Sequence, residues 1–181
     1  ELDRRCFELV TGQRAAYIGD EEATPDINLV FASNPTELVN QILYTRAIKT
    51  TYELSLIRKA SVIGARGHLA AKEGFEQNLS EFEIHIKFLE ATGLNEHALP
   101  YGNIVAQNDH ASLLHYQHQE RHVPDPILSL LIDAGGSYNG YASDITRTYC
   151  TSTEHEVFEA GVFRSLILAI TKLKDIIIAG A

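Results

Sequence analysis

Two aspartates have a spacing that could bring their carboxylates together. Asp133 ends an apolar run, and Asp144 follows after ten intervening residues that include Asn139-Gly140. Asn-Gly is a strong β-hairpin signal because both residues tolerate positive φ. A two-residue turn there pairs Asp133 with Thr146, and the alternation of side chains places both aspartates and Thr146 on one face. A turn centred one residue earlier would make the aspartates direct partners, so either register brings two carboxylates together.

Two neighbouring carboxylates repel each other and need a shared proton, a basic partner or a metal ion. Oxygen ligands suit manganese and similar hard divalent ions, and a pair of such ions can activate water for hydrolysis. The alternative without metal is that Asp133 bonds backbone amides in a turn and Asp144 pairs with a base such as Arg147. The two interpretations predict different partners for the same oxygens.

A second group of candidate residues is the histidine-rich stretch at residues 115–122. His115, His118 and His122 have helical zinc-site spacing, but two prolines follow closely and the preceding residues favour a strand, so a self-contained zinc site is disfavoured. His115 ends an apolar stretch and is expected at a strand end that faces a pocket, although a buried structural histidine is the commoner case. The other histidines are expected at the surface: His68, His85, His97, His110 and His155.

Composition excludes several classes of function. The chain is 45% hydrophobic and 22% charged, which is an ordinary globular composition, and its net charge of −9 argues against nucleic acid or anionic membrane as a partner. No apolar run approaches the roughly 18 residues that span a bilayer. Cys6 and Cys150 mark no disulfide framework and fit a reducing, cytoplasmic compartment. The chain begins at Glu1 and contains no methionine, so we expect it to be a piece of a longer protein.

Turn and capping signals predict a small N-terminal part and a larger second part, with a boundary in Arg46–Thr50. Residues 14–19 and 27–32 favour short strands, and Asn34 followed by Pro35 predicts the N-cap of a helix that ends near residue 44.

Three capping boxes predict the helices of the larger part. Thr50-x-x-Glu53 opens a helix that Gly74 ends, Ser80-x-x-Glu83 opens one that Gly93 ends, and Thr153-x-x-Glu156 opens one that reaches residue 179. The first helix is expected to bury Leu54, Ile57, Ser61, Ala65 and Leu69. Strands are expected at 102–106, 113–116, 128–133 and 143–150. Strands and helices in this order predict an α+β fold.

The stretch "LLIDAGGSYNGYASDITRTY", residues 130–149, resembles the first metal-binding segment of the pita-bread metallopeptidases. These include Xaa-Pro dipeptidase (prolidase), aminopeptidase P and methionine aminopeptidase. The aspartate spacing and the following "ITRT" carry the resemblance. The stretches "LPYGNIVAQNDHASLLHY" and "RAIKTTYELSLIRKAS" are similar to the bacterial prolidase branch in particular.

The resemblance implies that residues 1–46 are the C-terminal part of an N-terminal α/β domain and that residues 47–181 are the first half of a pita-bread domain. Asp144 would bridge two manganese ions and Asp133 would hold one. His115, Leu114 and Tyr101 would line the substrate pocket, and Thr146 would support the metal ligands. The implied protein is a homodimer that hydrolyses Xaa-Pro dipeptides.

The family's remaining ligands, a histidine and two glutamates, come from the second half of the pita-bread domain, which we do not find in this sequence. We therefore expect this chain alone to be inactive. Two alternatives remain open: an aminopeptidase P-like enzyme that takes longer peptides, and a non-catalytic pita-bread module that binds peptides.

Overall fold

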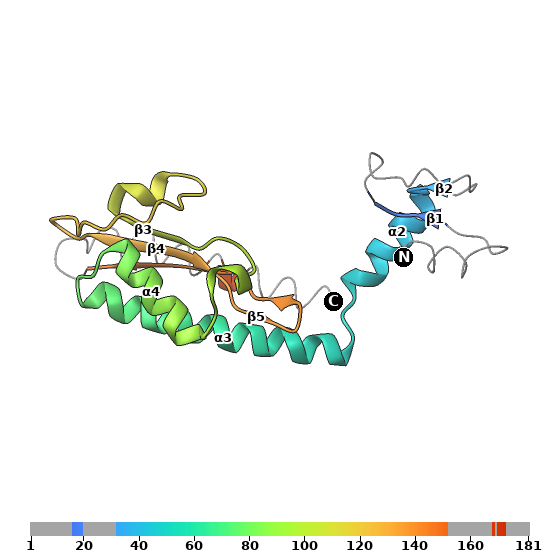
Figure 1. Cartoon of the computed structure of the whole chain (residues 1–181), viewed down its shortest axis with the longest axis horizontal. Coiled ribbons are helices and arrows are strands. Elements are labelled where there is room, and N and C mark those ends of the chain that lie inside the picture. The colour runs from blue at the N-terminus through green and yellow to red at the C-terminus, as the bar shows by residue number, and fades with distance from the viewer. Residues whose placement is uncertain (1–15, 20–31, 152–167, 169, 173–181) are drawn as a thin grey trace, which may run out of the picture. The chain divides into compact units, whose positions relative to one another are not determined.

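The structure is a computed structural model that describes residues 16–19, 32–151, 168 and 170–172 (Figure 1). The chain divides into two compact units, Glu1–Thr51 and Tyr52–Ala181. Both helices and strands are present, so the predicted α+β class is confirmed at that level. The predicted helix at residues 153–179 lies almost entirely outside the described residues. In the part of the chain that the structure describes, no helix is long and apolar enough to span a membrane.

In its described residues, the first unit contains two short parallel strands and one helix. Strand β1 (Ala16–Tyr17) pairs with β2 (Ala32–Ser33), and α2 (Thr36–Ala47) follows. Asn34 is not the N-cap that the sequence predicts, and it has a φ of 44°. Its side-chain amide forms hydrogen bonds with the backbone N–H and the backbone oxygen of Gly19. The amide therefore joins the chain just after β1 to the chain just after β2, and Pro35 takes the cap position.

The second unit is built on a three-stranded antiparallel sheet in the order β3-β4-β7 (Figure 1). The strands are β3 (Ile104–Gln107), β4 (Ser129–Ala134) and β7 (Ile145–Cys150). A small two-stranded ladder, β5 (Ser137–Tyr138) with β6 (Tyr141–Ala142), forms the tip of the hairpin. Of the two registers that the sequence allows, the structure has the one with a two-residue turn, because Tyr138 pairs with Tyr141 and Asp133 pairs with Thr146.

Two helices cover one face of this sheet: α3 (Thr51–Glu76) and α4 (Glu81–Thr92). The predicted ends of α4 are confirmed, since Ser80 and Glu83 form a capping box and Gly93 ends the helix in the left-handed conformation. Alternate residues of β4 point toward the helices. The core that results contains Ala71, Phe75, Ile84, Phe88, Val105, Leu130, Ile132 and Ala134.

The predicted buried face of α3 is wrong. Leu69 is 63% exposed and Leu54 is 37% exposed, whereas the buried face consists largely of small residues. Its members are Leu56, Ala60, Gly64, Gly67, His68, Ala71, Gly74 and Phe75. Small residues let the helix approach the sheet closely, and a hydrophobicity pattern does not detect them. Gly74 belongs to this face and does not end the helix, which continues to Glu76.

The segment between β3 and β4 also differs from the prediction. Residues 113–116 do not form a strand: a 3₁₀ helix, η3 (Asn108–Ser112), is followed by irregular chain. His115 and Gln119 have positive φ in this segment, which a strand would not allow. The expectation that His115 ends a strand is therefore wrong.

Candidate functional site: two carboxylates on one hydroxyl

Asp133 and Asp144 lie at the base of the hairpin. Asp133 is the fifth residue of β4 and is half-buried, while Asp144 precedes β7 and is exposed. Directly paired residues of a ladder share a face, so Asp133 lies with its partners Ile104 and Thr146 on the face away from α3 and α4. The candidate site therefore lies on the sheet face that these two helices do not cover.

Tyr101 connects the two carboxylates. Its phenolic oxygen lies 2.8 Å from Oδ1 of Asp133 and 3.0 Å from Oδ1 of Asp144. Burial raises the pKa of Tyr101 well above its usual range, and the two carboxylates raise it further, so the hydroxyl keeps its proton. A hydroxyl carries one proton, so it can donate fully to only one of the two oxygens. The predicted closeness of the aspartates is thus present, with Tyr101 between them.

The two carboxylates have no basic partner among the residues that the structure describes. Arg147, the base considered from the sequence, donates to the backbone oxygen of Thr146. Within the described ranges no backbone amide donates to either carboxylate, and neither takes part in an ion pair. The partners that the alternative without metal predicts are thus not found in the part of the chain that the structure describes.

The donor set fits a hard divalent cation, but only in part. Carboxylate oxygens are the ligands that manganese prefers, and a cation between them would remove their repulsion. Among the described residues, no group of three or more histidine, cysteine, aspartate or glutamate side chains could hold a metal ion. Asp133 and Asp144 can therefore supply two ligands, and the others would have to come from elsewhere.

A backbone contact sets the position of the hairpin base against α3. A Cβ on Gly136 would meet the backbone nitrogen of Gly64 at 2.6 Å and the oxygen of Ala60 at 2.7 Å. The Ser143 hydroxyl donates to the Ala60 oxygen at 3.1 Å and accepts from the Gly136 nitrogen at 2.9 Å. Because Ser143 directly precedes Asp144, this contact fixes the start of the segment that carries the second carboxylate.

Of the other predicted site residues, the structure places only Thr146 beside an aspartate among the described residues. Leu114 is 87% exposed and His115 is also exposed, both in the irregular segment after η3. Thr146 lies beside Asp133 across the ladder, with its side chain exposed. The substrate-binding roles of Leu114 and His115 and the supporting role of Thr146 stay predictions.

Two histidines that were expected at the surface are buried: His68 and His85. His68 lies behind the candidate site, and its Nε2 donates to the backbone oxygen of Ala134 at 2.9 Å. Burial lowers the pKa of His68, which favours the neutral ring. The hydrophobic periodicity gave no signal for His68, because its neighbours on the buried face are the small residues Gly64 and Ala71.

Comparison with known proteins supports the resemblance on which the site rests. Bacterial proteins named Xaa-Pro dipeptidase match most of the chain. The protein of Shewanella loihica is 48% identical over 166 residues, which are 92% of this chain and 36% of that protein. The protein of Proteus mirabilis is 46% identical over 147 residues, 80% of this chain and 33% of that protein. The chain thus spans about a third of the length of these relatives.

Solved structures of aminopeptidase P have a similar fold. Proline aminopeptidase P II from Yersinia pestis matches 78% of this chain and 32% of its own, with 27% identity and a TM-score of 0.65. Zinc-substituted aminopeptidase P of Escherichia coli, in complex with product, matches 61% of this chain and 26% of its own, with 30% identity and a TM-score of 0.55. The sequence profile of metallopeptidase family M24 matches residues 55–177. The chain therefore belongs to metallopeptidase family M24.

Proposed function

We propose that this chain is a segment of a longer, dinuclear metallopeptidase that hydrolyses Xaa-Pro dipeptides. The observation that carries the proposal is the pair Asp133 and Asp144, whose oxygens both lie within 3.0 Å of one hydroxyl and have no basic partner in the described ranges. Such a pair is unfavourable unless a shared proton, a base or a metal cation joins it, and a metal cation fits the oxygen ligands. Membership of a metallopeptidase family and the relatives named Xaa-Pro dipeptidase support the same function.

In this proposal residues 1–46 end an N-terminal α/β domain, and residues 47–181 form the first half of a pita-bread domain. Asp133 and Asp144 would hold manganese through their carboxylate oxygens. Two divalent ions polarise a carbonyl and activate water, and thereby supply the hydrolytic chemistry. Tyr101 would orient the two carboxylates, while Leu114 and His115 would contact the dipeptide. A histidine and two glutamates outside this chain would complete the ligand set, and the longer protein would be a homodimer.

Aminopeptidase P is the second candidate, because the solved structures with the same fold carry that name. The dipeptidase is favoured because the relatives of that name are 45–48% identical, against 27–30% for these two aminopeptidase P structures. A test is to assay the full-length protein with manganese on Gly-Pro and on a tripeptide with proline in second position. We expect hydrolysis of Gly-Pro, and its loss in Asp144→Asn. Hydrolysis of the tripeptide alone would identify an aminopeptidase instead.

A further inference from the structure

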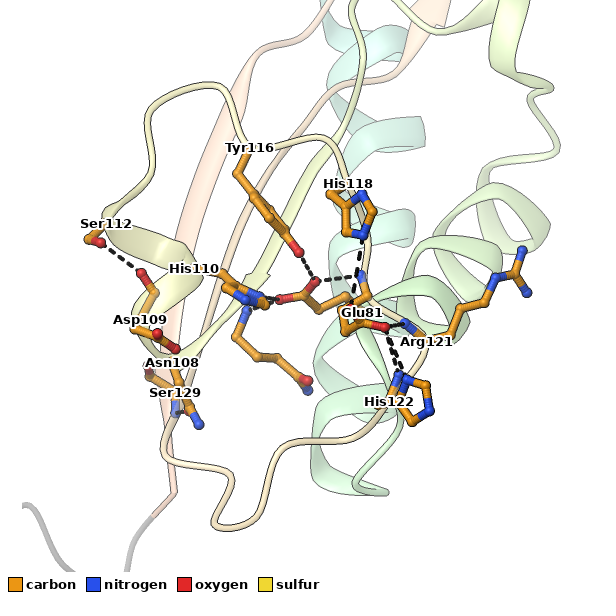
Figure 2. A network of polar contacts seen from close by, with 12 residues as sticks. Glu81, Asn108, Asp109, His110, Ser112, Tyr116, His118, Arg121, His122 and Ser129 are labelled. Carbon is orange, nitrogen blue, oxygen red and sulfur yellow. Dashed lines mark hydrogen bonds and ion pairs between the residues drawn. The ribbon is translucent and has the colours of Figure 1, made fainter.

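A second carboxylate site is formed by Glu81, which is buried at the start of α4 and accepts hydrogen bonds at both of its oxygens. Only 1% of its surface is exposed. The backbone amide of Gln107 donates to its Oε1 at 2.7 Å, and Nδ1 of His110 donates to the same oxygen at 2.8 Å. The Tyr116 hydroxyl and the Glu120 amide donate to its Oε2, both at 2.7 Å. A carboxylate offers about four acceptor positions, so none is left over. We call these five residues the Glu81 cluster (Figure 2).

All four donors come from one continuous stretch of chain. Gln107 ends β3, and the other three lie in the segment at residues 108–122, which we call the 108–122 loop. Figure 2 shows His110 and Tyr116 directed at the carboxylate from this loop. The two rings also stack on each other, with centroids 4.7 Å apart and planes at 26°. Glu81 therefore holds the loop near its start, in its middle and near its end.

The 108–122 loop needs such an acceptor because it forms no strand. The backbone amide of Phe82 in α4 donates to the backbone oxygen of Glu120 at 3.1 Å. The side-chain amide of Gln117 donates to the backbone oxygen of Gly102 at 3.0 Å. These bonds fix single points, whereas Glu81 accepts from three separate residues of the loop. An apolar residue at this position would leave the buried backbone amide of Gln107 and three partly buried donors without their acceptor, at a cost in free energy.

The stretch between the His110 and Tyr116 anchors contains Leu114 and His115. Both side chains are exposed. Their place in space therefore depends on the anchors on either side. We propose that Glu81 is a positioning residue, which acts through His110 and Tyr116 to hold Leu114 and His115 where an Xaa-Pro dipeptide contacts them. This inference rests on the proposed function.

The test compares Glu81→Gln with a matched control, Glu90→Gln, in the full-length protein. Glu90 is an exposed residue of the same helix, so the control makes the same chemical change without touching the loop. A glutamine at position 81 keeps one acceptor oxygen and turns an amide group toward two donors. We expect hydrogen exchange at the Gln107 and Glu120 amides to become about tenfold faster or more, and no change in the control.

Kinetics with Gly-Pro and manganese separate a positioning role from a general loss of stability. Misplacement of substrate-contacting groups by a fraction of an ångström is expected to raise KM for Gly-Pro at least about tenfold in Glu81→Gln. The manganese concentration that gives half-maximal activity should stay unchanged, because Asp133 and Asp144 lie on other elements. A protein that is simply less stable would show the same KM with less active enzyme.

A milder variant covers the case in which Glu81→Gln does not fold. Tyr116→Phe removes one of the four donors, and we expect the same changes at a smaller size. Loop exchange equal to that of Glu90→Gln overturns the positioning role, whether or not the enzyme is active. Faster exchange with an unchanged KM overturns the link to the substrate. If the wild type does not cleave Gly-Pro, the proposed function and the link to the substrate both fail. The exchange data then still decide whether Glu81 holds the 108–122 loop in place.

Discussion

The second unit holds two carboxylate sites that differ in how their oxygens are satisfied. Glu81 is a single carboxylate with four donors, and it is almost completely buried. Asp133 and Asp144 are two carboxylates that share one hydroxyl, and they lie on the sheet face away from the helices. The first site is complete within this stretch of chain, because every acceptor position has a donor. Among the described residues the second has more acceptors than donors, which is the feature on which the proposed cation site rests.

The largest expected effect tests this difference directly. Glu81→Ala should lower the free energy of unfolding by about 3–5 kcal/mol, because two amides and two side chains lose their buried acceptor. Asp133→Asn should change it by less than about 1 kcal/mol without divalent ions, because it removes one of two like charges and keeps an acceptor for Tyr101. Urea denaturation of the 181-residue chain measures both, with the exposed Glu90→Ala as control. Equal losses at the two sites would contradict the comparison.

A smaller effect is expected from manganese itself. We expect the 181-residue chain to be inactive and to bind manganese weakly through Asp133 and Asp144. Binding would raise the free energy of unfolding by about 1.4 kcal/mol at ten times the Kd. Calorimetric titration should show that Asp144→Asn abolishes this binding, whereas Asp109→Asn, an exposed acid of the 108–122 loop, leaves it intact. Two tightly held ions per chain would show that the ligand set is already complete.

Removal of the Tyr101 hydroxyl should change the free energy of unfolding by as much as manganese binding does, or by less, and the change should depend on whether manganese is present. Without divalent ions, Tyr101→Phe is expected to lower the free energy of unfolding by about 0.5–1.5 kcal/mol, the usual contribution of one hydrogen bond. Saturating manganese should reduce the loss, because a cation then takes over the role of the donor. Tyr52→Phe, at a 68% exposed tyrosine of α3, is the matched control. The same loss with and without manganese would argue against a cation between the carboxylates.

The smallest effect is a pH dependence with opposite signs at two histidines. The hydrogen bond to Glu81 raises the pKa of His110 above 6.5, so its contribution to stability is complete below pH 6.5 and is lost as pH rises through the raised pKa. Burial lowers the pKa of His68 below 6.5, so its contribution is present above pH 6.5 and is lost as pH falls toward the lowered pKa. Nuclear magnetic resonance titration of the two rings checks both directions.

A substitution at His110 isolates the contribution of this ring to the pH dependence of stability. His110→Gln should remove the loss of stability on the alkaline side, by less than about 1 kcal/mol because the ring is partly exposed and screened by solvent. The loss on the acid side, which belongs to His68, should remain. An unchanged alkaline slope in His110→Gln would show that the contact with Glu81 does not contribute.

The features predicted correctly from the sequence are local. The hairpin register follows from Asn139-Gly140 and the alternation of side chains, and the Ser80–Glu83 capping box needs only four residues of chain. The features missed depend on distant partners. Tyr101 meets the two aspartates from 32 and 43 residues away, and Glu81 meets Glu120 from 39 residues away. No periodicity reports such contacts, and only the resemblance pointed to Tyr101.

The contact between Gly64 and Gly136 limits how this protein can change over time. No amino acid is smaller than glycine, so every substitution at either position adds side-chain atoms. At Gly136 the added carbon would meet backbone atoms, which cannot turn aside as a flexible side chain can. Accumulated mutation can therefore act here in one direction only, by pushing the hairpin away from α3 and changing the separation of Asp133 and Asp144. The geometry of the proposed cation site is thus tied to two residues that have no side chains.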